Sequence, residues 1–157
     1  SALPGGGYLL VFDTAIGAGV ATPAATFTTT GVGCPSPVGL PALSAVQLPV
    51  FGATFEIAMS NVSSTGVPFM FMGLMAFPPG FPINALGLAT DPSCLLSVSL
   101  DQVFGPLATV GSTVSLQLPM PPNSVFIGLQ AHFQGAQLEF TTGYWNLSDQ
   151  GTVTIGF

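Results

Sequence analysis

Glycine and proline recur every few residues along this chain, and their spacing leaves no room for a long helix. The 157 residues include 20 glycines and 15 prolines. No uninterrupted stretch of typical helix length, about 12 residues, shows the apolar spacing of three and four that marks an amphipathic helix. Both residue types break helices and form tight turns. The sequence therefore predicts short strands joined by turns.

Strand patterns are frequent. In residues 95–101, apolar and polar residues alternate, which predicts a half-buried strand with Leu96, Val98 and Leu100 facing inward and Ser99 facing outward. The same alternation appears in the ranges 53–61, 113–119, 124–134 and 151–157. These segments favour antiparallel sheets with one face in a core.

Two more continuously apolar runs, residues 68–75 and 83–89, are typical of strands covered on both faces. With residues 8–12, 42–50 and 137–143 they bring the total to about ten strands, separated by clusters of turn residues. Short strands with no intervening helices predict an all-β fold, a jelly-roll-like β-sandwich.

The composition changes near Gly31. Residues 14–33 are almost entirely small residues, threonine, glycine and proline, which predicts an extended linker holding at most one short strand. We therefore divide the chain into residues 1–30, an N-terminal strand and its linker, and residues 31–157, the β-sandwich domain. The N-terminal strand consists of Tyr8, Leu9, Leu10, Val11 and Phe12.

The charge is unusual. The chain has no lysine or arginine, six acidic residues and one histidine, so charged residues make up 4%, against about 25% in ordinary globular proteins. Without cationic side chains it cannot neutralise phosphates, which argues against nucleic acid and anionic lipid as partners. Its most apolar stretch, residues 69–77, is only nine residues long. A membrane-spanning helix needs roughly 20.

Cys34 and Cys94 are the only cysteines. The chain begins at Ser1 without methionine, as a secreted chain does once its signal peptide is removed, so we expect an extracellular or cell-surface location. An even number of cysteines in such a chain predicts a disulfide between the two. Two buried free thiols are the alternative.

Five motifs occur in order along residues 31–157. They are GVGCPSPVGLPAL (31–43), LPVFGATFEI (48–57), DPSCLLSVSLD (91–101), LQLPMPPNSVFIGLQAHFQ (116–134) and GTVTIGF (151–157). This part of the chain resembles a family of secreted, largely uncharacterised β-domains of planctomycetes and myxobacteria. The resemblance implies an extracellular β-domain with a Cys34–Cys94 bridge and no enzymatic activity. It does not extend to residues 8–12, and the lysines and arginines that members can carry are missing here.

Catalytic residues are scarce. His132 lies between Gln130 and Gln134 on the polar face of a predicted strand, as a solvated histidine does, although a Ser-His-Asp arrangement assembled in space stays open. Among the acids, only Glu56 and Glu139 lie on predicted strands away from turns, where a glycosidase pair would need them. No residues have zinc or calcium spacing. We therefore expect no enzyme, no metal and no cofactor.

A surface so poor in charge needs another source of solubility, and covalent glycans would supply it. Asn61 and Asn146 begin Asn-x-Ser sequons, and a run of threonines offers candidates for O-linked sugars. These threonines are Thr28, Thr29 and Thr30. The alternative is that they are plain strand and linker residues.

The N-terminal strand suggests a function. On its linker it can reach a sheet edge of another copy, and such head-to-tail addition propagates into a fibre. The first hypothesis is thus a structural, self-associating subunit of an extracellular bacterial fibre or surface layer. The strand can instead fold back onto its own sandwich. A second hypothesis is a carbohydrate-binding or adhesive module using Tyr144 and Trp145, and a third is a hydrolase using His132.

Overall fold

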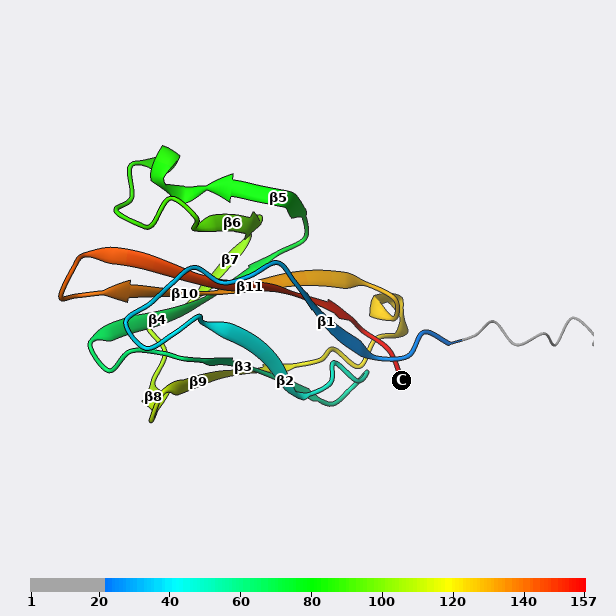
Figure 1. The fold of residues 1–157 in the computed structure, drawn as a ribbon. Helices are drawn as coiled ribbons and strands as arrows, with labels where there is room; N and C mark the ends of the chain where they lie inside the picture. The colour runs from blue at the N-terminus through cyan, green and yellow to red at the C-terminus, as the bar shows by residue number, and fades with distance from the viewer. Residues whose placement is uncertain (1–21) are drawn as a thin grey trace, which may run out of the picture.

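The computed structural model describes residues 22–157, so the predicted strand at residues 8–12 lies outside the described residues. The described part is almost entirely β-structure, with two short 3-10 helices (Figure 1). The elements are β1 (Thr26–Thr30), β2 (Ala42–Gln47), β3 (Thr54–Ser60), β4 (Gly66–Gly73), β5 (Ala76–Pro82), η1 (Ile83–Leu86), β6 (Leu95–Val98), β7 (Gln102–Phe104), β8 (Thr109–Val110), β9 (Thr113–Pro119), η2 (Ser124–Phe126), β10 (Gln130–Glu139) and β11 (Tyr144–Thr154).

Two antiparallel sheets pack face to face and form a β-sandwich, which confirms the predicted fold class (Figure 1). One sheet has five strands in the order β1-β11-β10-β4-β7, and the other has four in the order β2-β3-β9-β8. The long hairpin of β10 and β11 forms the middle of the larger sheet, with Gln130 opposite Thr154 and Glu139 opposite Tyr144.

The main core lies between these sheets. Alternation in β3 buries Phe55, Ile57 and Met59, each with no exposed surface, as the sequence predicts. Phe133 of β10 meets Phe55 edge to face, with ring centroids 5.6 Å apart. The remaining buried members of this core are Leu43, Val62, Met70, Val114 and Val153.

A third layer covers the outer face of the larger sheet. It is the two-stranded sheet of β5 and β6, drawn above β10 and β11 in Figure 1. A second core lies beneath it, formed by Cys34, Ile83, Cys94, Leu96, Val98, Ala136 and Leu147. This layer explains the continuously apolar run in β4. Met70 belongs to the main core, whereas Phe69 and Phe71 pack against the second.

The prediction of a strand at residues 83–89 is wrong. Residues Ile83–Leu86 form the 3-10 helix η1, which ends at Gly87 in a left-handed conformation with φ 78°. Proline before this segment and glycine after it favour a tight turn. Apolar character alone does not distinguish a short buried strand from such a turn.

Two further predictions need correction at strand ends. The segment 124–134 starts as the 3-10 helix η2, capped by the side chain of Asn123, and Val125 is 72% exposed instead of inward. Strand β6 ends at Val98, so the alternation stops there. Leu100 is 51% exposed and Ser99 is buried, because the Ser99 N–H donates to the Met75 carbonyl as the chain leaves the sheet.

The sandwich begins earlier than the composition indicates. Strand β1 pairs with β11 along its whole length, from Thr26 opposite Thr154 to Thr30 opposite Gln150. Phe27 packs against the main core. The short strand allowed for in the linker is therefore part of the larger sheet, and β-structure starts five residues before the boundary placed at residue 31.

Candidate functional site

One strand of the smaller sheet has a free edge. On one side, β9 pairs with β3 from Thr54 opposite Pro119 to Met59 opposite Val114. On its other side it meets only β8, whose register reaches no farther than Val114. Within residues 22–157, no strand pairs with this side of β9 beyond Val114.

The backbone groups on that edge follow from the strand geometry. The Met120 N–H donates to the Ala53 carbonyl of the neighbouring segment at 2.8 Å. Alternate residues of a strand direct their backbone groups to the same side. Ser115 and Gln117 therefore direct their N–H and C=O groups to the free edge, and both residues are exposed. Pro119 can offer only a carbonyl there.

An apolar cleft lies between the two sheets next to this edge. Its volume is about 180 Å³. It lies where Leu118 and Met120 of the smaller sheet face Met72 and Leu74 of the larger one, and Phe55 contributes to its wall. The other lining residues are Pro121, Phe126, Leu129, Ala131, Phe133, Val153 and Ile155. An apolar cavity of about 150 Å³ holds a benzene molecule, so this cleft has room for about one large apolar side chain.

The described chain begins at the same end of the molecule. The Phe157 N–H donates to the Pro23 carbonyl at 3.1 Å, and the Ala25 N–H donates to the Phe157 carbonyl at 3.3 Å. The Gly128 N–H donates to the carbonyl of Ile155, a lining residue of the cleft, at 2.7 Å. Figure 1 shows the start of the described chain beside the C-terminus. Residue 22 therefore lies close to the cleft.

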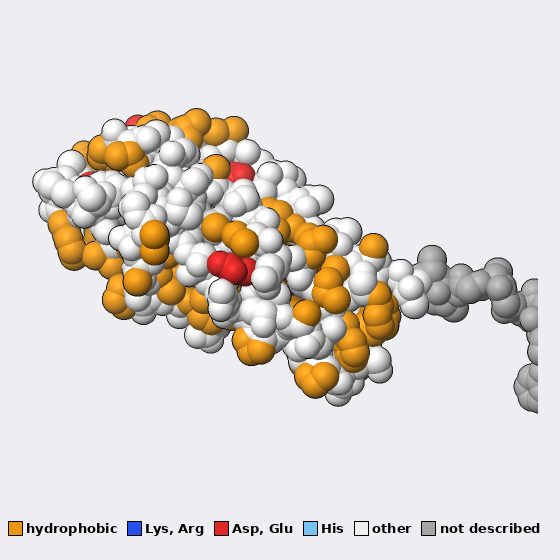
Figure 2. All heavy atoms as spheres, turned by 90° about the horizontal axis from the view of Figure 1, so that it is seen from below, with side chains coloured by type: hydrophobic (Ala, Val, Ile, Leu, Met, Phe, Trp, Pro, Cys, Tyr) orange, Lys and Arg blue, Asp and Glu red, His pale blue; other side chains and the backbone are white. Residues whose placement is uncertain are grey.

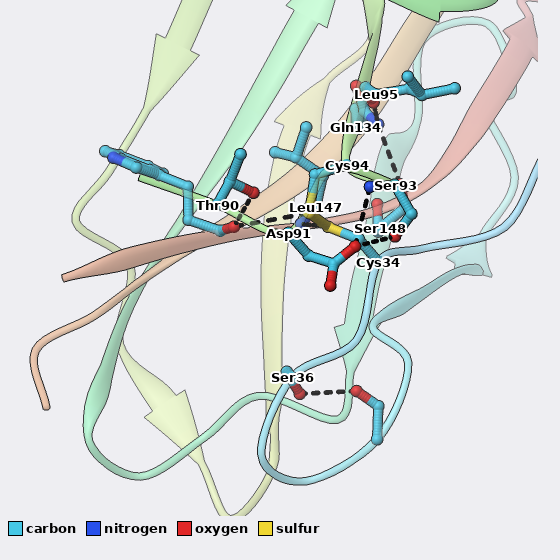
Figure 3. The surroundings of a disulfide bond; sticks show 12 residues. Cys34, Ser36, Thr90, Asp91, Ser93, Cys94, Leu95, Gln134, Leu147 and Ser148 are labelled. Carbon is cyan, nitrogen blue, oxygen red and sulfur yellow. Dashed lines mark hydrogen bonds between the residues drawn. A yellow bond between two sulfur atoms is a disulfide. The ribbon is translucent and has the colours of Figure 1, made fainter. Parts of the chain in front are cut away.

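The predicted disulfide is confirmed. Cys34 and Cys94 are joined across 60 residues of sequence, with their Cα atoms 4.9 Å apart (Figure 3). Cys34 also binds β11, since its N–H donates to the Leu147 carbonyl at 2.8 Å. The bridge thus ties the segment before β6 to the sandwich and holds the third layer in place.

A buried amide makes a second tie between the third layer and the sandwich. Gln134 of β10 is 1% exposed. Its Oε1 accepts from the Ser97 N–H at 2.8 Å, and its Nε2 donates to the carbonyls of Leu95 at 2.8 Å and Ser148 at 2.9 Å. The side chain thereby serves as a pairing partner for β6. Across residues 22–157, no buried side-chain nitrogen or oxygen lacks a hydrogen-bond partner.

Glu139 is buried and Asp149 is half-buried, in a chain that has no lysine or arginine to pair with them. Burial raises the pKa of Glu139, but hydrogen bonds from Thr65, Ser63, Thr141 and Gln137 outweigh it and hold that pKa below its ordinary value. Burial raises the pKa of Asp149, although its Oδ1 accepts from the Leu43 N–H at 2.7 Å. Both carboxylates are thus hydrogen-bonded to structural partners.

The structure does not bring the candidate catalytic residues together. His132 is half-buried on β10, and its Nδ1 lies 3.0 Å from the Thr152 hydroxyl and 3.3 Å from Gln150 Nε2. Burial lowers its pKa. Glu56 belongs to the smaller sheet and accepts from Gln117 at 3.1 Å, whereas Glu139 belongs to the larger sheet. Within the described residues, no three His, Cys, Asp or Glu side chains form a group that could hold a metal ion.

The candidate glycan acceptors differ in exposure. Thr28, Thr29 and Thr30 are exposed on β1, at the outer edge of the larger sheet. Asn61 is half-buried and its Nδ2 donates to the Leu40 carbonyl at 2.7 Å. Asn146 is only 4% exposed within β11, so its amide is not accessible in the folded subunit.

The predicted carbohydrate-binding aromatics lie at the start of β11. Tyr144 is 48% exposed, whereas Trp145 is half-buried and stacks at a tilt on Phe69 with centroids 5.6 Å apart. The Trp145 carbonyl also accepts from the Thr90 hydroxyl at 2.7 Å (Figure 3). Trp145 packs against the second core, and of the two aromatic side chains Tyr144 is the one exposed at the surface.

Sequence reasoning predicted β9 as a strand and missed its free edge, because periodicity reports which way side chains point and not which strand lies alongside. Comparison with known proteins adds nothing to this geometry: no family model, no curated protein and no solved structure matches the chain. No helix among residues 22–157 is long and apolar enough to span a membrane.

Proposed function

We propose that this protein is the structural subunit of an extracellular fibre, in which residues 8–12 of each copy add as a strand to a sheet edge of the next copy. One observation carries the proposal: among residues 22–157 the sandwich has an unpaired strand edge beside an apolar cleft, and the sequence that precedes these residues contains an apolar five-residue segment. A strand that binds such an edge gains backbone hydrogen bonds and buries alternate side chains.

The surface of the subunit supports permanent neighbours. Large apolar side chains are exposed on many elements, among them Val110 at 83%, Val32 at 76%, Val125 at 72% and Phe140 at 70%. Figure 2 shows hydrophobic side chains spread over one face and gathered at the end where the described chain begins. With only six acids and no cations in the chain, little charge repulsion keeps copies apart. Assembly would cover part of this surface.

The contact between copies would be head-to-tail. The segment and the edge are different surfaces of one chain, so each bound copy still offers a free segment at one end and a free edge at the other. Such head-to-tail contacts grow without limit unless rotation closes them. A surface layer would need further lateral contacts between the fibres.

An extracellular location and covalently attached sugars are part of the same proposal. A buried disulfide suits an oxidising compartment. Thr28, Thr29 and Thr30 are exposed on an edge strand, where attached sugars would project into solvent and offset the low surface charge.

The experiment compares the full chain with two single variants by negative-stain microscopy and light scattering. Leu10→Asp puts a charge in the middle of the adding strand, and Ala18→Asp puts the same charge in the linker. We expect fibres from the unaltered chain and from Ala18→Asp, and dispersed subunits from Leu10→Asp. An unaltered chain that stays monomeric at high concentration would contradict the proposal, as would fibres formed by Leu10→Asp.

A further inference from the structure

We infer that the acceptor for residues 8–12 is the free edge of β9 from Ser115 to Pro119, together with the apolar cleft beside it, in a second copy of the chain. This inference rests on the proposed function and specifies where its contact forms. The occupant is named by the chain itself, because the segment is the apolar run in the part of the sequence that precedes the described residues.

The backbone groups of the edge match a strand of this length. Ser115 and Gln117 each direct one N–H and one C=O to the edge, and Pro119 adds a carbonyl. Neighbouring antiparallel residues exchange hydrogen bonds in pairs at every second position. A partner of five residues would satisfy this edge from one end to the other, and Tyr8–Phe12 has that length. The edge would then no longer be open to other strands.

The side chains match the cleft. In a strand, Tyr8, Leu10 and Phe12 share one face, and Leu9 and Val11 share the other. Both faces are apolar, so either can be directed between the sheets. Leu118 and Met120 already point into the cleft, and a strand paired with β9 would place its inward side chains next to them. A volume of about 180 Å³ admits one leucine or phenylalanine side chain at the centre of the segment.

Other sheet edges fit less well. Prolines at positions 78, 79 and 82 lie on β5, and proline blocks strand addition. The Leu43 N–H of β2 already donates to Asp149. Strand β7 has only three residues. Beside β1, Phe27 packs against the main core, and the hollow at the Thr30 end of this strand is lined in part by the polar residues Ser97 and Gln150.

The linker sets the reach of the segment. The ten steps from residue 12 to residue 22 span at most about 35 Å when extended. The described chain starts near the Ile155 end of the cleft, as shown above. A neighbour whose cleft faces that end is therefore within reach. The chain's own cleft is also within reach, so the test must separate exchange between copies from folding back.

Cysteine cross-linking of the full chain provides this separation. Gln117→Cys places a thiol on the exposed face of the edge, and it is combined in turn with Leu9→Cys, Leu10→Cys and Val11→Cys. Opposed residues of neighbouring strands bring their Cβ atoms to about 5 Å, close to disulfide distance. The native cysteines are already bonded and at most 2% exposed. The matched control replaces Gln117→Cys by Thr28→Cys, an exposed position on the opposite edge strand.

After oxidation, non-reducing gels of the assembled protein should show a ladder of covalent oligomers for at least one Gln117→Cys pair and none for the Thr28→Cys pairs. A cross-linked monomer would overturn the inference, because the segment would occupy its own cleft. Fibres without any Gln117→Cys cross-link would overturn it as well, since another surface would then accept the strand. If the unaltered chain forms no fibres at all, the proposed function fails instead.

A backbone variant gives an independent readout. Gln117→Pro removes the N–H that faces the free edge and breaks no backbone hydrogen bond to β3. It removes only the exposed side-chain bond from Gln117 to Glu56, so the sandwich should keep its circular dichroism spectrum. We expect the concentration needed for assembly to rise at least tenfold, roughly the loss of one hydrogen bond of about 1.4 kcal/mol. Gln117→Ala is the control, because it removes the same side chain and its bond to Glu56 but keeps the backbone N–H, and it should assemble normally. Equal assembly of the Gln117→Pro and Gln117→Ala variants would contradict the assigned acceptor.

Discussion

Gln134 is the side chain whose replacement tests most directly how the third layer is held. Gln134→Leu keeps a side chain of similar size in a site that is 1% exposed, so no large cavity forms. It removes three hydrogen bonds at once, from the Ser97 N–H and to the carbonyls of Leu95 and Ser148. All three lost partners are backbone groups that cannot be substituted away.

The cost follows from the burial of these partners. Ser148 is 1% exposed, so its carbonyl is left without water, at about 1–3 kcal/mol. Leu95 and Ser97 are half-buried, and water can replace part of what they lose. We expect a total loss of about 3 kcal/mol in the free energy of unfolding. Single domains have about 5–15 kcal/mol in all, so the effect should be large.

Urea denaturation followed by circular dichroism measures this loss, and hydrogen exchange at the Ser97 amide locates it. The matched control is Gln150→Leu on the same sheet, because Gln150 bonds only to the side chains of His132 and Thr152. We expect that control to cost less than about 1 kcal/mol. If both variants lose the same stability, or if Ser97 stays protected in Gln134→Leu, the assigned role of Gln134 is refuted.

Two further predictions concern covalent and acid-linked stability. Replacing Cys34 and Cys94 together by serine opens a loop of 60 residues and should cost about 4 kcal/mol on the loop-entropy model, measured by urea denaturation with and without reductant. An unchanged midpoint would exclude a stabilising bridge. The lowered pKa of Glu139 means that its stabilisation is complete above the ordinary pKa of the carboxyl and is lost as the pH falls through the lowered value. Glu139→Gln should therefore flatten the decline of thermal stability below about pH 4; an equally steep decline would contradict this assignment.

The sequence predicts the strands best where one face of the strand meets the core. Residues 113–119 alternate because one face of the strand meets the core, and residues 54–60 do so except at Ala58, which is also buried. Residues 83–86 mislead, since the apolar side chain of Ile83 is buried by a turn as effectively as by a strand. The third layer is indicated only by the apolar run at residues 68–75, which predicts cover on both faces, and the pairing of β5 with β6 is not predicted. This layer depends on a glutamine that replaces a strand partner, and nothing in the local pattern around Gln134 indicates this.

The candidate site was harder to predict than the strands. The free edge of β9 exists because the pairing of β9 with β8 extends no farther than Val114. Strand β8 is short because the chain has just crossed from the larger sheet, after β7, to the smaller one. Side-chain periodicity contains no information about where a neighbouring strand stops. By contrast, the pairing of Cys34 with Cys94 was predictable, because the chain contains only two cysteines.

The absence of lysine and arginine has a consequence for the material that such subunits would make. At physiological ionic strength, dissolved ions largely screen the attraction between opposite charges that are more than about 8 Å apart. In this protein almost no such attraction exists to be screened. The six acids repel one another, and salt relieves that repulsion. Cohesion that depends on amides, hydroxyls and apolar contacts would persist from fresh water to brine, and rising salinity would draw the units together.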